Sequence, residues 1–358
     1  MNPQTQSHPA TATAAPTELV LDVGPVAHGG HCVARHEGRV IFVRHGIPGE
    51  KVRVRLTDAG ESAKFWRADV VEVLEASPDR VEHFWRPADS LRAWAHGHPP
   101  VGGAEFGHIS LARQRTLKSA VLAEQLQRLA AVERLPDGLD LGNLVEAVEA
   151  VDAGGRDSSL GTDSTYDAGT GLGWRTRASF SVTPGGKLGM HAHRSDHVIA
   201  VREMPLATER INRLRLWDLD LTGIERVEVA APSNGSRPLV LLAPAPGTKP
   251  KRLSAIAAQL PDDVSVATFD PQTGEVAQLR GRTWVQESAA GHDYRVTGAG
   301  FWQIHRDAPG TLVGPSQNSS TMADSWRRVP WWPTSTPGPG CSRLPWPTRW
   351  GRPGPFSR

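Results

Sequence analysis

The sequence predicts a small all-β barrel of the OB type followed by an α+β domain. Between residues 18 and 74, short segments of alternating apolar and polar residues are separated by turns that contain Gly and Pro, which favours a small barrel. Between residues 109 and 133, apolar residues recur at three- and four-residue steps and predict an amphipathic helix. From residue 174 to 305, strand-like and helical segments alternate, which indicates a mostly antiparallel sheet with helices.

The best-defined strand of the barrel is 51–56. Its basic and apolar residues alternate strictly, so Lys51, Arg53 and Arg55 share one face while Val and Leu residues occupy the other. Further strands are predicted at 18–23, 39–43, 68–74, 177–182, 197–201, 227–230, 239–242 and 264–269.

The composition divides the chain into five segments. Residues 1–16, rich in Ala, Thr, Pro and Gln, carry no signal-peptide pattern and predict a disordered leader. The barrel occupies 17–77, a linker and helix follow at 78–135, and the α+β domain spans 136–313. Residues 314–358 are rich in Trp, Pro and Arg without an apolar period, which predicts a disordered tail.

Charge and cysteine content exclude several classes of protein. The net charge is only +2, so any basic surface for nucleic acid has to be local. The two cysteines, Cys32 and Cys341, exclude a disulfide scaffold and a four-thiolate metal site. His191 and His193 are spaced as a pair of metal ligands, but no third ligand is evident, so we predict no metal. Without an apolar run of membrane length, we expect a cytoplasmic protein.

Basic residues of the barrel are candidates for phosphate contact. An adjacent pair, Phe65 and Trp66, offers a stacking surface. The alternative is a solvated strand face with Trp66 in the core. The basic candidates are Arg39, Arg44, Lys51, Arg53, Arg55, Lys64 and Arg67.

The second domain carries two further candidate sites for RNA. Arg175 and Arg177 lie at positions i and i+2 of a strand and share one face, where they can hold successive phosphates; the alternative is an ordinary exposed strand. The Gly-rich turn at 298–305 delivers Phe301, His305 and the amide of Gln303, and the alternative is a turn that packs a Trp into the core.

Taken in order, these segments resemble the TRAM-domain RNA uracil-C5 methyltransferases, which use S-adenosylmethionine. The resemblance covers roughly residues 17–313. The segments that carry it are 21–30 (LDVGPVAHGG), 46–54 (GIPGEKVRV), 102–108 (GGAEFGH), 174–178 (WRTRA), 188–190 (LGM), 201–206 (VREMPL) and 300–305 (GFWQIH).

The resemblance implies a substrate, a methyl donor and one cofactor contact. It implies binding of transfer or ribosomal RNA by a monomer, with Gln303 contacting S-adenosylmethionine. Many members of the family hold an iron–sulfur cluster through cysteines around a Cys-Gly-Gly-Cys segment. Residues 101–104 here are Val-Gly-Gly-Ala, so we predict no cluster.

The C-terminal region departs from the family pattern. The family's reaction needs a Cys thiolate that adds to carbon six of uracil, a base that removes the proton from carbon five, and a Rossmann-like cofactor domain. None is evident after Thr311, so we assign no catalytic residue. We expect the α/β methyltransferase domain to be missing and the chain to be an inactive N-terminal fragment. Shifting the frame across 331–341 permits a cofactor-type strand and turn, so we hypothesise a frameshift, which the nucleotide sequence tests.

Three functional interpretations follow from these patterns. The first is an S-adenosylmethionine-dependent RNA uracil-C5 methyltransferase by descent. The second is a non-catalytic RNA-binding protein that uses the barrel as a clamp. The third is a translation or RNA-processing factor with a generic oligonucleotide-binding barrel; segments 174–178 and 301–305 favour the first interpretation over it.

Overall fold

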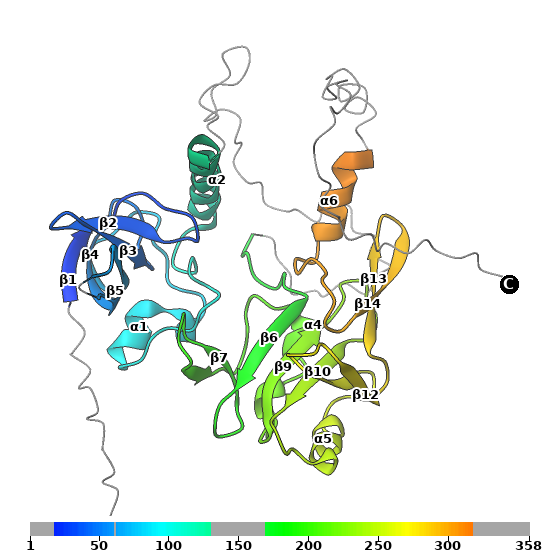
Figure 1. The fold of residues 1–358 in the computed structure, drawn as a ribbon. Helices are drawn as coiled ribbons and strands as arrows, with labels where there is room; N and C mark the ends of the chain where they lie inside the picture. Colours follow the sequence, from blue (N-terminus) through cyan, green and yellow to red (C-terminus); the bar gives the residue numbers. More distant parts are fainter. Residues whose placement is uncertain (1–17, 61, 130–168, 318–358) are drawn as a thin grey trace, which may run out of the picture. The chain divides into compact units, whose positions relative to one another are not determined.

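A computed structural model describes residues 18–60, 62–129 and 169–317 (Figure 1). The chain divides into a compact unit that ends at Leu312 and a second unit, Val313–Arg358, nearly all of which lies outside the described residues. The predicted leader, most of the predicted tail and the segment of the proposed frameshift also lie outside them. No helix in the described part is both long and apolar enough to span a membrane.

The N-terminal sheet has five strands in the order β1-β4-β5-β3-β2. The β3–β5 pair is parallel, whereas β1–β4, β4–β5 and β2–β3 are antiparallel. The strands enclose one apolar core, and β4 supplies three of its residues at every second position, Val52, Val54 and Leu56. The strands are β1 (Glu18–Asp22), β2 (Cys32–His36), β3 (Arg39–Arg44), β4 (Lys51–Asp58) and β5 (Phe65–Glu75).

The segment after the barrel contains short helices and then one long one. These are η1 (Arg86–Ala88), α1 (Ser90–Ala95) and α2 (Leu111–Leu129). The carboxylate of Asp89 caps α1 by accepting a hydrogen bond from the amide of Leu91. The side chain of Gln114 donates to the carbonyls of Phe106 and Ile109, which fixes the start of α2 to the preceding turn.

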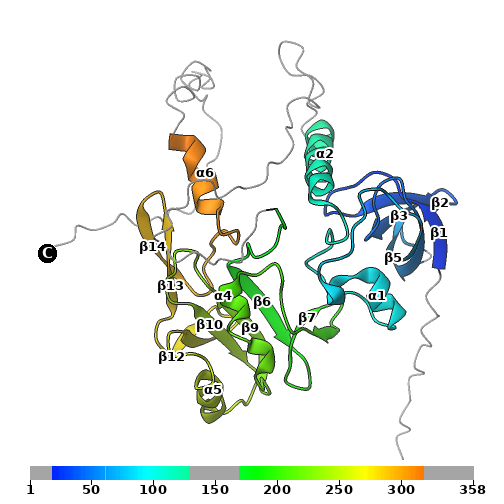
Figure 2. The ribbon, with the colours of Figure 1, turned by 180° about the vertical axis from the view of Figure 1, so that it is seen from behind.

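The C-terminal sheet has seven strands in the order β12-β11-β10-β9-β6-β7-β8, and a separate hairpin, β13–β14, follows it. Helix α5 connects β10 to β11 and packs beside β12 (Figure 2). The strands are β6 (Arg177–Val182), β7 (Leu188–His191), β8 (Val198–Ala200), β9 (Ile224–Ala230), β10 (Leu239–Pro244), β11 (Ser265–Phe269), β12 (Val276–Arg280), β13 (Trp284–Ala289) and β14 (His292–Thr297). The helices are α4 (Glu209–Asn212), η3 (Leu216–Asp218), α5 (Pro250–Ala257) and α6 (Ala308–Gln317).

The core of the larger sheet also takes in residues of the preceding linker. Trp85 is fully buried there, together with Ala88, Val101 and Ala104. An isolated bridge between Val101 and Ala192 and a hydrogen bond from the amide of Gly102 to the carbonyl of His191 tie this stretch to the sheet. The two ends of the stretch 85–104 therefore pack in the C-terminal domain's core, whereas α1 between them packs against β5 of the barrel.

The predicted fold class, a barrel and an α+β domain with the α/β methyltransferase domain missing, requires correction. Both sheets are mixed: β10 and β11 run parallel around the α5 crossover, and β3 and β5 run parallel in the barrel. Alternating residues reveal strands but not their direction, which the connections decide. The missing domain was inferred because the family's catalytic Cys, base and cofactor turn are not evident after Thr311, in a segment that lies mostly outside the described residues.

Candidate nucleic-acid interface

The outward side of β3 and β5 carries an exposed aromatic ring beside a cation. Phe65 is 36% exposed, and its ring meets the edge of Phe42 with centroids 5.2 Å apart. The guanidinium of Arg67 lies 4.7 Å from the Phe65 ring centroid while also pairing with Asp58 at 2.6 Å. Lys64 is exposed and forms no ion pair within the described residues. A ring that accepts a base next to cations that accept a phosphate is the combination that single-stranded nucleic acids need.

The ring of Trp66 faces the other side of β5. It is partly buried against the barrel core, and its indole nitrogen donates to the carbonyl of Gly60 over 3.1 Å. Arg39 covers the ring, with its guanidinium carbon 4.4 Å from the centroid. Of the two predicted stacking residues, Phe65 is thus the exposed one and Trp66 a packing residue.

The basic face of β4 is balanced by acids on the neighbouring strands. Lys51 lies 3.9 Å from Glu75, Arg53 lies 2.8 Å from Glu72, and Arg55 lies 2.6 Å from Glu18. Exposed pairs of this kind contribute only about 0–1 kcal/mol each, so a phosphate can displace the acid at little cost. These cations remain candidate phosphate contacts, but they do not form a free positive surface.

The structure gives Arg44 a structural role in the barrel. Its side chain is almost wholly buried and donates two hydrogen bonds to Asp69, from Nε over 2.8 Å and from Nη2 over 2.7 Å. The same carboxylate accepts a hydrogen bond from the indole of Trp94. We therefore leave Arg44 out of the proposed RNA surface.

In the C-terminal domain, Arg177 anchors the turn that precedes the 300–305 segment. Its Nη1 donates to the carbonyl of Gly300 over 2.9 Å, and its Nη2 lies 3.5 Å from a carboxylate oxygen of Glu287. The second contact is an ion pair without hydrogen-bond geometry. Burial lowers the pKa of Arg177 and raises the pKa of Glu287 to about 7, and the Arg177 charge only partly offsets the effect on Glu287.

The Glu287 carboxyl is expected to make the stability of the protein depend on pH. The pKa of this carboxyl is about 7 in the folded protein, above its ordinary 4.5. Its contribution to the free energy of unfolding is therefore fully present below about pH 4.5 and is lost as the pH rises through 7. The variant Glu287→Gln has no titrating group at this position. The difference in unfolding free energy, wild type minus variant, should therefore fall by up to about 1.4 kcal/mol for each pH unit between about pH 4.5 and 7. Urea unfolding from about pH 5 to pH 8 measures the difference; parallel curves for the two proteins contradict the assignment.

Arg175 lines the same cavity as Arg177. Its side chain makes no hydrogen bond or ion pair within the described residues, its Nε is buried, and burial lowers its pKa. Its guanidinium carbon lies 5.2 Å from the ring centroid of Trp174. The cavity has a volume of about 430 Å³ and is lined by both arginines and by Gly298, Gly300 and Phe301.

The turn at 298–305 presents its side chains mostly to solvent. Phe301 is 83% exposed and Gln303 is exposed, whereas Trp302 is half-buried and tilts against Tyr294. Gly298 is required because a Cβ there would lie 2.7 Å from a methyl group of Leu241. The turn thus holds Phe301 outward.

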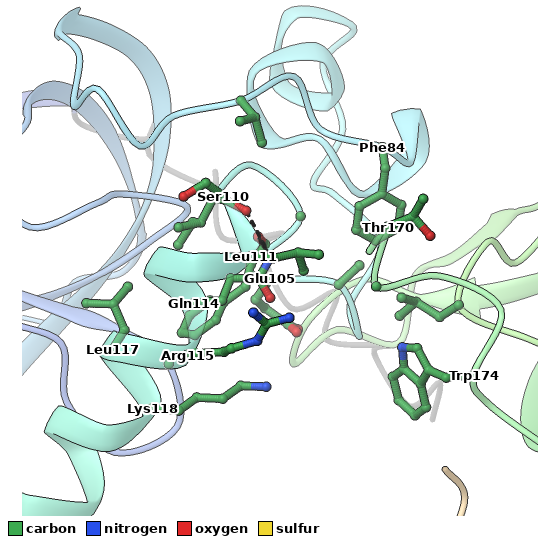
Figure 3. Close-up of a pocket in the computed structure, with 18 of the residues that line it drawn as sticks. Phe84, Glu105, Ser110, Leu111, Gln114, Arg115, Leu117, Lys118, Thr170 and Trp174 are labelled. Atoms are coloured by element: carbon green, nitrogen blue, oxygen red, sulfur yellow. Dashed lines mark hydrogen bonds between the residues drawn. The ribbon is translucent and has the colours of Figure 1, made fainter. Parts of the chain in front are cut away.

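A larger pocket, about 1000 Å³ in volume, lies between α2 and the start of the C-terminal domain (Figure 3). One wall contains Trp174, whose ring stacks on His305 with centroids 5.4 Å apart and planes 14° apart. Figure 3 shows Arg115 and Lys118 reaching from α2 into the pocket opposite Trp174, and Phe84 pointing in from the linker. Arg115, Lys118, Phe84 and Trp174 are not among the site residues predicted from the sequence.

The sequence contains one feature that indicates a basic surface at this pocket. Arg115 and Lys118 are three residues apart on a predicted helix and therefore share a face. Nothing in the sequence indicated that this face is opposite Trp174. Sequence reasoning also missed Glu287, because a single acid in a polar hairpin carries no local signature of burial.

The comparisons with known proteins identify the barrel and show which proteins the chain resembles. The TRAM domain family matches residues 17–71, so this is a TRAM-domain protein. A protein of Streptomyces avermitilis named "Uncharacterized RNA methyltransferase" is 37% identical over 297 residues, which are 83% of this chain and 62% of that protein. A protein of Streptomyces coelicolor with a similar name is 38% identical over 83% of this chain and 59% of its own length.

Two further matches carry names that specify a uracil. A 23S rRNA (uracil(1939)-C(5))-methyltransferase of Shewanella amazonensis is 33% identical over 114 residues, 32% of this chain and 23% of its own length. A crystal structure of a Pyrococcus abyssi tRNA (uracil-54, C5)-methyltransferase with S-adenosyl-L-homocysteine covers 83% of this chain and 65% of its own, at 14% identity and a TM-score of 0.48.

Residues 17–71 match the TRAM domain, and over 83% of its length the chain is similar to proteins named as RNA methyltransferases, the family whose motifs its sequence resembles. It spans about 60% of the length of the Streptomyces relatives. These matches complete the correction of the fold class. The sequence is related to RNA methyltransferases over 83% of its length, so the prediction that the methyltransferase domain is missing is wrong as a description of the fold.

Proposed function

We propose that this protein takes part in the S-adenosylmethionine-dependent methylation of uracil C5 in RNA, and that the described residues bind the RNA. The observation that supports this proposal is the length of the sequence match to proteins named as RNA methyltransferases. The match to proteins named as RNA methyltransferases runs over 297 residues, well beyond the TRAM domain at 17–71. The name of the Shewanella amazonensis relative, which specifies uracil C5 of 23S rRNA, supports the finer assignment.

The surfaces of the described part suit single-stranded RNA. On the barrel, Phe65 offers a stacking face beside Arg67 and Lys64. In the C-terminal domain, Arg175 lines a cavity beside the exposed ring of Phe301. The sites, like the domain boundaries at 17–77, 78–135 and 136–313, are part of this proposal.

The methyl donor has one predicted contact in the described part, Gln303. This side chain is exposed and lines neither of the cavities described above, so neither of them is a cradle that joins Gln303 to S-adenosylmethionine. The contact rests on the sequence resemblance alone, and we derive no step through the donor and assign no catalytic residue.

The iron–sulfur prediction concerns the segment 101–104, where Val101 and Ala104 are buried apolar residues. The described cysteine, Cys32, lies in the barrel core, and burial raises the pKa of its thiol to about 12. Among the described residues, no three His, Cys, Asp or Glu side chains are grouped to hold a metal. The prediction that the protein uses no cluster stays a prediction.

A gene deletion tests the proposed function. Deleting the gene should remove one 5-methyluridine from ribosomal or transfer RNA, and expression of the natural gene product should restore it. Nucleoside mass spectrometry of the two purified RNA classes measures the loss and shows which class is the substrate. Unchanged 5-methyluridine in both classes refutes the methylation, and affinity of the protein for RNA would then favour the non-catalytic RNA-binding alternative.

A further inference from the structure

The pocket beside α2 contains two cations without a protein partner. Arg115 and Lys118 line it, and neither side chain forms an ion pair or a hydrogen bond with another described residue. Two acids also line the pocket. Glu82 pairs with Arg92 over 3.0 Å, whereas Glu105 keeps its negative charge and accepts a hydrogen bond from the amide of Gly103 over 2.9 Å. An anionic group can therefore pair with Arg115 and Lys118 without displacing an acid from either.

The rest of the pocket is largely apolar and aromatic. Phe84 is 36% exposed and lines the pocket, and its ring centroid lies 5.1 Å from that of His83, so the exposed part of the ring is available to a ligand. Trp174 directs the nitrogen-bearing edge of its indole into the pocket (Figure 3). An apolar ring face, an N–H donor and two cations together match a nucleotide, which has a flat base, base-edge acceptors and a phosphate.

The aromatic wall is held in place by backbone contacts on both sides of Trp174. The amide of Gly173 donates to the carbonyl of Pro205, and the amide of Arg306 donates to the carbonyl of Trp174 itself. On the far side, Nδ1 of His305 accepts from the amide of Asp307, which fixes the ring that stacks on the indole. The wall is thus preorganised, so little side-chain entropy is lost when a ligand binds.

We propose that this pocket binds one unstacked nucleotide of single-stranded RNA, with its phosphate on Arg115 and Lys118 and its base on Phe84. The inference rests on the proposed function because it names a subsite for the same RNA. A base inside a duplex is stacked on both faces and cannot reach Phe84, so the subsite selects single-stranded segments. It is separate from the barrel surface at Phe65.

Charge variants test the phosphate half of the proposal. The probe is a labelled single-stranded uridine octamer, titrated with the full chain at several salt concentrations. Replacing both Arg115 and Lys118 with Ala should lower the slope of log affinity against log salt by about 1.4, or about 0.7 per cation. The matched control is Arg128→Ala on the same helix, which is exposed, paired with Glu124 and outside the pocket. A double variant whose slope equals that of Arg128→Ala overturns the proposal.

Variants of Phe84 test the stacking half. Phe84→Ala should weaken binding of the octamer by roughly 5- to 150-fold, the loss measured for removal of one base–aromatic stack. Phe84→Tyr keeps the ring and should retain wild-type affinity. Equal weakening by both substitutions, or none by either, overturns the proposal, as does an equal effect of Phe84→Ala on a duplex of the same sequence. Because the gene deletion measures methylation without these variants, failure of the subsite is distinguishable from failure of the proposed function.

Discussion

Replacing Asp69 with alanine is expected to lower the free energy of unfolding by about 3–5 kcal/mol. The Asp69 side chain is fully buried on β5 and accepts two hydrogen bonds from Arg44 and one, over 3.1 Å, from Trp94. Removing the carboxylate leaves the Arg44 guanidinium charged, buried and unpaired. That loss exceeds what the pair adds to stability when it is intact, because an uncompensated buried charge is costly.

Urea unfolding at neutral pH measures this change. The matched control is Asp58→Ala, which breaks the pair with Arg67 at the surface, where the Asp58 side chain is 54% exposed; it should cost less than about 1 kcal/mol. Replacing both Arg44 and Asp69 with apolar residues of similar size should cost less than Asp69→Ala alone. If Asp69→Ala is no more destabilising than Asp58→Ala, the structural role assigned to Arg44 is wrong.

Replacing Glu50 with alanine is expected to have a comparable effect, about 3–5 kcal/mol. Glu50 is 1% exposed, and its carboxylate accepts hydrogen bonds of 2.6 Å from both Nε and Nη2 of Arg80. It also accepts from the amide of Ile47 over 2.9 Å and from the amide of Ser77 over 3.2 Å. One side chain thus ties the turn before β4, the end of the barrel and the linker together. Its removal leaves two amides without their acceptor and leaves the Arg80 guanidinium with the carbonyl of His45 but no counter-charge.

Hydrogen exchange separates this effect from a general loss of stability. In Glu50→Ala, the Ile47 amide should exchange faster relative to the barrel core amides, because its acceptor is gone. The control is Glu72→Ala, which removes an exposed partner of Arg53 and should leave both unfolding and exchange nearly unchanged. Protection of the Ile47 amide at the wild-type level in Glu50→Ala contradicts the hydrogen bond from this amide to the Glu50 carboxylate.

Local patterns predicted the elements that have an apolar period. The predicted strand at 177–182 coincides with β6, and the alternation at 51–56 lies within β4, whose apolar residues are buried as expected. The hairpin strand β14 was not predicted, because its side chains are mostly exposed and no apolar alternation is needed where nothing is buried. Helix α5 was also not predicted. It begins at Pro250, and proline is favourable at the first position of a helix.

By itself, the sequence determined which segments alternate, where their turns fall and which family the order of motifs resembles, because these properties depend on neighbours along the chain. Only the tertiary structure decided which cations are buried and which lie at the surface. Arg44 and Arg67 are both barrel arginines, yet one is buried against Asp69 and the other lies over an exposed ring. It also brought Phe84, Lys118 and Trp174 to one pocket from separate segments. Burial and pairing are set by residues distant in the chain, and a local pattern carries no information about them.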